Sequence, residues 1–112
     1  MIARLTSAFF VSQLTRRLFA DGGFASVLRS GAEAAGAVYV VTRMRDGTIQ
    51  LYGPASQTHV AEDGERRFMA EQVEDEAALG ARMEREARFD PDYWLVEIET
   101  ATPERYLDIV AV

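Results

Sequence analysis

The stretch that most restricts how this chain can fold is Phe89–Glu99, Phe-Asp-Pro-Asp-Tyr-Trp-Leu-Val-Glu-Ile-Glu. Pro91 biases Asp90 away from helical geometry, so the stretch predicts the end of a helix followed by a turn. A strand then alternates between two faces, with Trp94, Val96 and Ile98 on one and Tyr93, Leu95, Glu97 and Glu99 on the other. A tryptophan brings about 200 Å² to a core, so we expect this strand at the centre of a sheet.

Length and composition indicate one compact domain spanning residues 1–112. Of these residues 48% are apolar and 27% charged, and the net charge is −6; the two fractions are ordinary for a globular protein. The chain has no cysteine, which excludes disulfides, thiolate metal sites and a thiolate nucleophile. It shows neither a secretory signal nor an apolar run of about 20 residues. We therefore expect a cytoplasmic protein without a membrane span.

Two segments have the pattern of amphipathic helices. The first runs from about Ser7 to Asp21, with Thr6 or Ser7 as its cap and Gly22-Gly23 at its end. The second runs over about 74–88 and is rich in Ala, Glu, Arg and Leu. Its apolar stripe stays in phase back to Phe68, so a single helix over 65–88 is an alternative. Residues 66–73 are otherwise a short strand or a helical turn.

Residues 38–52 predict a β-hairpin, because two apolar runs flank Asp46-Gly47. A two-residue type I′ turn there pairs Met44 with Ile49, and Val41 with Tyr52. The expected inner face then holds Val38, Val40, Thr42, Met44, Ile49 and Leu51, and the outer face Arg43, Arg45, Thr48 and Gln50. Gly53-Pro54 ends the second strand, since proline donates no ladder hydrogen bond.

Two further segments remain open between strand and helix. Residues 24–30 fit a strand closed by Gly31 or the apolar stripe of a helix, and a run this short does not decide. Residues 105–112 fit a last strand antiparallel to the Trp94 strand. The alternative there is a short helix with Thr102 as cap and Pro103 in its first turn.

Together these patterns predict an α+β fold: a mainly antiparallel sheet of about five strands packed against two helices. The expected strands are 24–30, 38–45, 48–52, 93–99 and 105–111. Both helices are expected to cover one face of the sheet.

The order of segments resembles a small bacterial family catalogued only as a domain of unknown function. The resemblance rests on four stretches: Phe10–Arg17, Gly36–Val41, Asp46–Thr48 leading to Leu51–Ala55, and Arg85–Glu99. The last is the most specific, and residues 102–112 match least well. The resemblance implies a stand-alone domain and favours a strand at 24–30. It implies no activity and no catalytic residue.

Asp90, Asp92, Glu97 and Glu99 form the one dense acidic group near the predicted centre. Carboxylates at Asp92, Glu97 and Glu99 are suited to a hard cation. Pro91-Asp92 followed by Glu97-Ile-Glu99 is similar to a nuclease pattern, but the lysine of that pattern is absent, since the chain has no lysine. We expect the aspartates to shape the turn and the glutamates to face water, and so no metal site.

The remaining polar candidates are a histidine and a set of arginines. His59, the single histidine, lies in a polar loop without a positioned nucleophile. Arg16 and Arg17, with Arg4, Arg29, Arg43 and Arg45 and beside Tyr39 and Tyr52, have the composition of a weak nucleic-acid surface. The net charge of −6 opposes phosphate, so we do not expect nucleic-acid binding.

We therefore expect a non-catalytic binding or protein-interaction domain that needs no cofactor. A homodimer is expected, because Phe9 lies on an apolar ridge at the back of the first helix and the strands leave sheet edges open. Phe9, Arg16 and Arg17 are the candidate interaction residues, for a second copy or an unidentified protein partner. The alternative function is a divalent-metal-dependent hydrolase at Asp92, Glu97 and Glu99.

Overall fold

The structure, a computed structural model, describes residues 5–55 and 66–111. His59 and its neighbours in the polar loop lie outside the described residues. The elements follow in the order α1 (Ser7–Ala20), β1 (Phe24–Arg29), β2 (Val38–Arg43), β3 (Ile49–Pro54), β4 (Arg67–Glu71), α2 (Glu76–Phe89), β5 (Trp94–Glu99), the short 3₁₀ helix η2 (Pro103–Arg105) and β6 (Asp108–Ile109).

The strands form one six-stranded mixed sheet in the order β1-β5-β2-β3-β4-β6. β5 runs parallel to β2, β6 runs parallel to β4, and the other three pairings are antiparallel. The predicted α+β fold with two helices is confirmed, although the sheet is mixed rather than purely antiparallel. Of residues 24–30, Phe24–Arg29 form a strand, so the helical alternative is wrong. The Trp94 strand is an interior one, paired on both sides, but it lies next to the edge strand β1.

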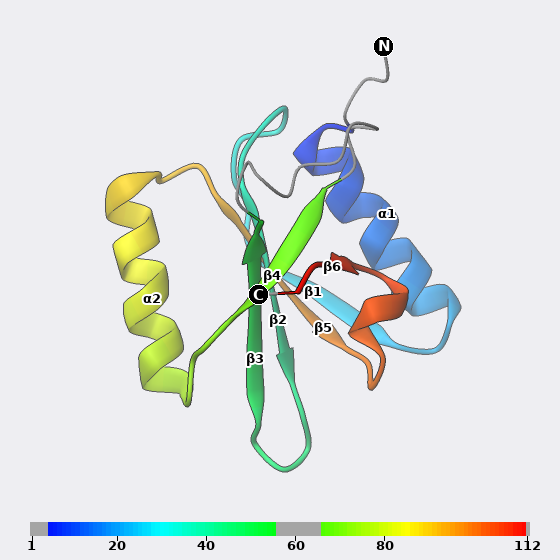
Figure 1. Cartoon of the computed structure of the whole chain (residues 1–112). Helices are drawn as coiled ribbons and strands as arrows, with labels where there is room; N and C mark the ends of the chain where they lie inside the picture. The colour runs from blue at the N-terminus through cyan, green and yellow to red at the C-terminus, as the bar shows by residue number, and fades with distance from the viewer. Residues whose placement is uncertain (1–4, 56–65, 112) are drawn as a thin grey trace.

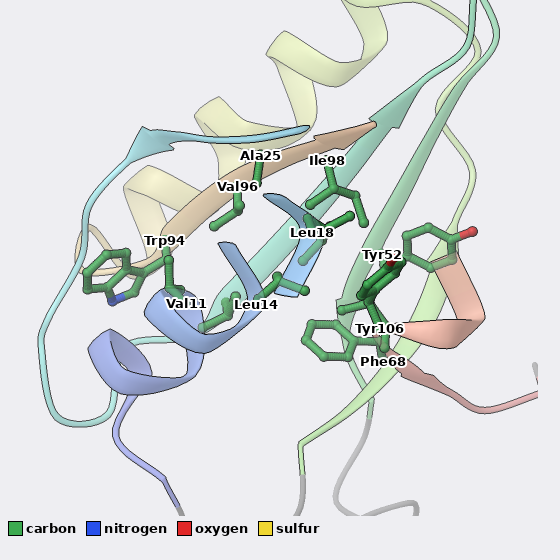
Figure 2. Close-up of a cluster of buried hydrophobic side chains, with 13 residues drawn as sticks. Val11, Leu14, Leu18, Ala25, Tyr52, Phe68, Trp94, Val96, Ile98 and Tyr106 are labelled. Atoms are coloured by element: carbon green, nitrogen blue, oxygen red, sulfur yellow. The ribbon is translucent and has the colours of Figure 1, made fainter. Parts of the chain in front are cut away.

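The two helices lie on opposite faces of the sheet (Figure 1). Leu14 and Leu18 of α1 pack on the face that carries Trp94, Val96 and Ile98 (Figure 2). Leu79 and Met83 of α2 pack on the other face, against Tyr39, Val41, Leu51 and Leu95. The expectation that both helices cover one face is therefore wrong. The reason is that β2 is apolar on both faces, as is typical of strands buried on both sides. Each face of the sheet therefore needs a helix to cover it.

The hairpin of β2 and β3 forms, but one residue away from its predicted register. Val41 pairs with Leu51, and Arg43 pairs with Ile49. A type I′ turn needs positive φ at both central residues, and among the described residues only Gly22 and Gly47 have it. The loop is instead three residues long, and Gly47 (φ 91°) takes the left-handed position. Arg43 consequently faces α2 together with Ile49 and Leu51.

The predicted alternation of side chains along β5 is confirmed, and so is the burial of Trp94. Its side chain is 8% exposed, and its indole Nε1 donates to the carbonyl oxygen of Ala32 at 2.9 Å. The chain between β1 and β2 therefore wraps around the start of β5. Gly31 and Gly36 permit this contact, because a Cβ on either would lie under 2.5 Å from the carbonyl oxygen of Asp92.

The helix α2 begins only at Glu76, where the Asp75 side chain accepts from the N–H of Ala78. Residues 67–71 before it form β4, so the alternative of one helix over 65–88 is wrong.

The C-terminal segment contains both a short helix and a short strand, the two alternatives that the sequence left open. Pro103–Arg105 form η2 directly after Thr102, and β6 follows. β6 pairs in parallel with β4, Arg67 opposite Asp108, so the expected antiparallel pairing with the Trp94 strand is wrong. Both sides of β5 are already occupied by β1 and β2, and buried Tyr106 holds the segment near α1 by donating to Asp21 at 2.7 Å.

Candidate interaction surface

The three carboxylates of the metal hypothesis occupy different surroundings. Asp92 lies in the turn before β5, where its N–H donates to the Asp90 carboxylate at 3.1 Å. Glu97 lies five residues further, about 16 Å along an extended chain, and Glu99 is exposed at the end of β5. In the described part of the chain, no group of three or more His, Asp or Glu residues is placed to hold a metal ion.

Glu97 is bound by Arg43, which the predicted register placed on the face opposite Ile49 and Leu51. Arg43 Nη1 lies 2.6 Å from Glu97 Oε1, and Arg43 Nε lies 2.7 Å from Glu76 Oε2. The hydrogen bond from Arg43 lowers the pKa of Glu76 below its ordinary value. Glu97 therefore serves an ion pair that links β5, β2 and the first turn of α2.

The candidate arginines do not form one strip. Arg16 contacts Ser12 on the exposed side of α1, and Arg17 donates to the Arg105 carbonyl oxygen. Arg29 donates to the Pro91 carbonyl oxygen at 2.7 Å and lies 4.5 Å from the centre of the Tyr93 ring. Arg43 is bound to glutamates on the α2 side of the sheet. Arg4 is outside the described residues.

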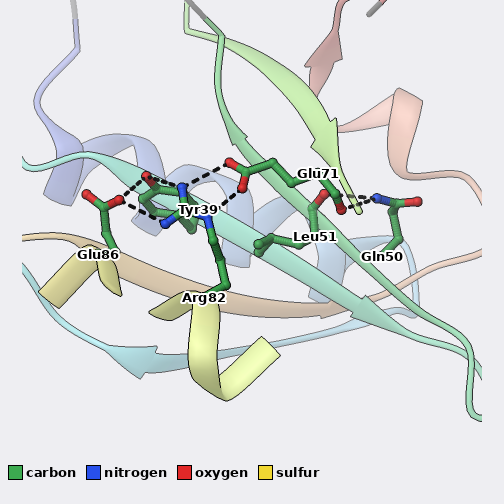
Figure 3. Close-up of polar contacts among 6 residues, drawn as sticks. All are labelled: Tyr39, Gln50, Leu51, Glu71, Arg82 and Glu86. Carbon is green, nitrogen blue, oxygen red and sulfur yellow. Dashed lines mark hydrogen bonds and ion pairs between the residues drawn. The ribbon is translucent and has the colours of Figure 1, made fainter. Parts of the chain in front are cut away.

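A polar cluster of hydrogen bonds and ion pairs joins Tyr39, Glu71, Arg82 and Glu86 beside α2 (Figure 3). Arg82 lies 2.7 Å from Glu71 Oε1 and 3.2 Å from Glu86 Oε1. The Tyr39 hydroxyl donates to Glu86 at 2.8 Å. Burial, reinforced by the hydrogen bond to Glu86, raises the pKa of Tyr39 to about 12. The phenol therefore stays protonated near neutral pH, and the cluster links α2 to β2 and β4.

Sequence reasoning missed this cluster. The Arg82–Glu86 spacing of four residues on one helix was the available signal. The partners Tyr39 and Glu71 come from strands whose pairing the sequence did not fix.

Stability should respond to alkaline pH through Tyr39. Its pKa is raised from 10.0 to about 12, so its contribution is complete below pH 10 and is lost as pH rises through 12. The free energy of unfolding should fall over that interval by about 2 kcal/mol more in the wild type than in Tyr39→Phe. Urea unfolding at a series of alkaline pH values measures the difference. Equal pH dependence of the two proteins would contradict it.

Large apolar side chains are exposed along the free edge of the sheet at β1. We call them the β1 patch: Phe19, Phe24, Val27 and Leu28, with exposed fractions of 53%, 41%, 41% and 46%. The Phe19 and Phe24 rings contact edge to face, 5.7 Å between centres. Within residues 5–55 and 66–111, β1 has β5 on one side and no strand on the other.

The two edges of the sheet differ. The opposite edge ends in β6, only two residues long, and an ion pair joins Arg67 of β4 to Asp108 at 3.0 Å. Short strands and charges are common protections against edge-to-edge pairing. β1 is six residues long and its one charged residue is Arg29, so β1 is the less protected edge. A bulge between Val27 and Arg29 is its one irregularity.

The sequence pointed to Phe9 rather than to the β1 patch. Phe9 is 49% exposed, near exposed Leu5 at the start of α1, and as an interaction residue it stays a prediction, as do Arg16 and Arg17. The β1 patch was missed because residues 24–30 were compatible with a helix. The run Phe-Ala-Ser-Val-Leu, apolar on both faces of a strand, was the signal.

An open crevice of about 600 Å³ adjoins the start of β1. Its walls come from the turn after α1, the hairpin after β2 and the end of β5, and include Phe24, Met44, Arg45 and Glu99. Since Phe24 belongs both to the crevice and to the β1 patch, the two form one continuous surface.

None of the described helices is long and apolar enough to cross a membrane.

Comparison with known proteins gives a family and several similar solved structures. The sequence model of a family described as "Protein of unknown function (DUF1491)" matches residues 5–108. The chain is similar to the solution structure of protein Atu0922 from A. tumefaciens, with 48% identity, a TM-score of 0.84 and 98% of each chain covered.

Two further similar structures are DUF1491 family proteins from Caulobacter crescentus. The crystal structure has 35% identity and a TM-score of 0.76, covering 96% of this chain and 99% of that one. The NMR structure has 38% identity and a TM-score of 0.74, covering 96% and 98%. No curated protein matches the chain.

Proposed function

Since this chain belongs to the DUF1491 family of proteins of unknown function, we propose that it is a small cytoplasmic, non-catalytic interaction domain that binds protein through the open edge of β1. An extended segment of the bound protein would add a strand to the sheet beside β1.

The observation that carries this proposal is the coincidence of an open strand edge with exposed apolar side chains. An edge strand presents unpaired N–H and C=O groups along its length, and main-chain hydrogen bonds to such an edge supply affinity in strand addition. Phe24 and Val27 are each 41% exposed, and they lie on opposite faces of the sheet, since Phe24 is level with Glu99 and Val27 with Val96. An added strand would therefore find apolar contacts on both faces.

The backbone around β1 supports binding without rearrangement. β1 is held by five register pairs with β5, and Arg29 is fixed by the Pro91 carbonyl oxygen and the Tyr93 ring. A rigid edge loses little conformational freedom when a segment binds, which lowers the cost of association. The carboxylates at Asp92, Glu97 and Glu99 carry no second proposal, because Glu97 is ion-paired with Arg43.

Selection of displayed eight-residue peptides on the folded protein tests this function. We expect the enriched peptides to alternate apolar and polar residues and to bind the wild type with micromolar dissociation constants. Leu28→Lys, which adds a charge to the exposed bulge of β1, should weaken them at least about tenfold, or 1.4 kcal/mol. Microscale thermophoresis of fluorescently labelled protein at nanomolar concentration, with unlabelled peptide titrated through the micromolar range, measures the binding.

Phe9→Lys is the matched control and tests the competing surface predicted from the sequence, because Phe9 is exposed to a similar degree (49%) but lies on α1. It should leave peptide binding unchanged. Peptides that bind Leu28→Lys as tightly as the wild type, or a selection that enriches none, would overturn the proposed function.

A further inference from the structure

We propose that the segment bound at β1 is β1 of a second copy of this chain, in antiparallel orientation, so that the two sheets join into one. This inference rests on the proposed function and specifies its partner. The two copies are related by a twofold axis perpendicular to the sheet, and α1 of both copies then lies on the same side of the joined sheet.

The first argument is that β1 is complementary to itself. Antiparallel pairing of two identical strands is isologous, so one patch satisfies both sides and the contact closes as a dimer. The outward N–H and C=O groups of one β1 then meet those of the other. Pairing of the β1 edge in this way leaves no equivalent edge on that side for a third copy.

The second argument comes from charge. Arg29 is the only charged residue of β1. Parallel pairing would place the two Arg29 side chains next to each other, and like charges directly opposite on neighbouring strands destabilise. Antiparallel pairing moves each Arg29 to the Phe24 end of the other copy.

That end of β1 is acidic. Phe24 is level with Glu99 on the neighbouring strand β5, and Asp21 lies in the turn that precedes β1. Arg29 is level with Leu95, on the same face of the sheet as Glu99. Arg29 keeps its contacts with Pro91 and Tyr93 of its own copy. In the antiparallel dimer its positive charge therefore lies near the acidic end of the other copy instead of beside the other Arg29, which favours this orientation.

The third argument is apolar burial on both sides of the joined sheet. On the α2 face one Phe24 side chain lies at each end of the shared ladder, and on the α1 face the two Val27 side chains lie near its centre. Leu28, at the bulge and 46% exposed, adds to the contact. Because the patch comprises few side chains, the interface lies at the small end of protein interfaces, and we expect a micromolar dissociation constant.

Sedimentation equilibrium of the full chain tests the inference. The chain mass is 12.5 kDa. The average mass of the wild type should rise from that value toward twice that value between about 1 µM and about 500 µM, as for a micromolar dimer. Leu28→Lys, and separately Val27→Lys, should shift this rise in average mass to concentrations at least about tenfold higher. Circular dichroism confirms that each variant is folded, and Phe9→Lys should dimerise like the wild type.

A wild type that stays monomeric overturns the second-copy inference alone, since peptide binding at the β1 edge is measured independently at nanomolar protein. A dimer that survives both β1 substitutions, or one that Phe9→Lys dissociates, places the contact elsewhere and also overturns it.

Discussion

Trp94→Ala is expected to lower the free energy of unfolding by about 3–5 kcal/mol, the range for deleting a large buried aromatic side chain. The indole is 8% exposed and packs in the cluster that includes Val11, Leu14 and Val96 (Figure 2). The substitution also removes the hydrogen bond from Nε1 to the Ala32 carbonyl oxygen. Urea unfolding followed by circular dichroism measures the change.

Phe89→Ala is the control for this measurement. Phe89 is also aromatic and is 89% exposed at the end of α2, so its removal should change stability by no more than about 0.5 kcal/mol. If the two substitutions cost the same, Trp94 does not contribute to the core as described.

Gly31→Ala is expected to destabilise the protein by about 3 kcal/mol, at the upper end of the range for overpacking. The added Cβ would lie 2.2 Å from the Asp92 carbonyl oxygen and 2.6 Å from the Tyr93 carbonyl carbon. Both atoms belong to the backbone at the start of β5, so the clash is relieved only by moving the chain between β1 and β2 away from Trp94.

Gly80→Ala supplies the opposite expectation with the same chemical change. A Cβ at Gly80 meets nothing within 4 Å, and the residue lies within α2. Alanine there should stabilise by up to about 1 kcal/mol through helix propensity. Thermal or urea unfolding of the two variants compares them directly. Equal signs for the two would contradict the close contact at Gly31.

Local signals in the sequence predicted most of the elements. Thr6 does cap α1 by accepting from the N–H of Phe9, and Pro91 does follow the end of α2. The Phe89–Glu99 stretch gave the correct alternation of β5, because one face of that strand meets α1 and the other meets α2. Each of these signals acts between residues that are close in the sequence, and the local structure follows it.

The placement of elements on the sheet was harder to predict. The hairpin register failed because β2 is buried on both faces, so a shift of one residue exchanged one apolar face for another at little hydrophobic cost. Because β2 is apolar on both faces, its sequence also did not show which face each helix covers, and the position of α2 was therefore not predicted. A strand that alternated between apolar and polar residues would have fixed both.

The sequence predicted the type of candidate surface, an open sheet edge, but not its position. Open sheet edges were expected, but which strand would be the edge depended on β5 pairing in parallel with β2, a long-range contact without a local signal. The C-terminal segment was misplaced for a related reason, since Tyr106 and Leu107 bury their side chains in the α1-side cluster and thereby bring β6 to β4.

Amide hydrogen exchange at two protein concentrations tests most directly whether the β1 edge is where this protein associates. Residues 24–29 should exchange more slowly at about 500 µM than at about 5 µM, because pairing with a second copy protects the outward amides. The first turn of α1 around Phe9 should exchange equally at both concentrations. Equal exchange of residues 24–29 at the two concentrations, or concentration-dependent protection around Phe9 instead, would contradict the account.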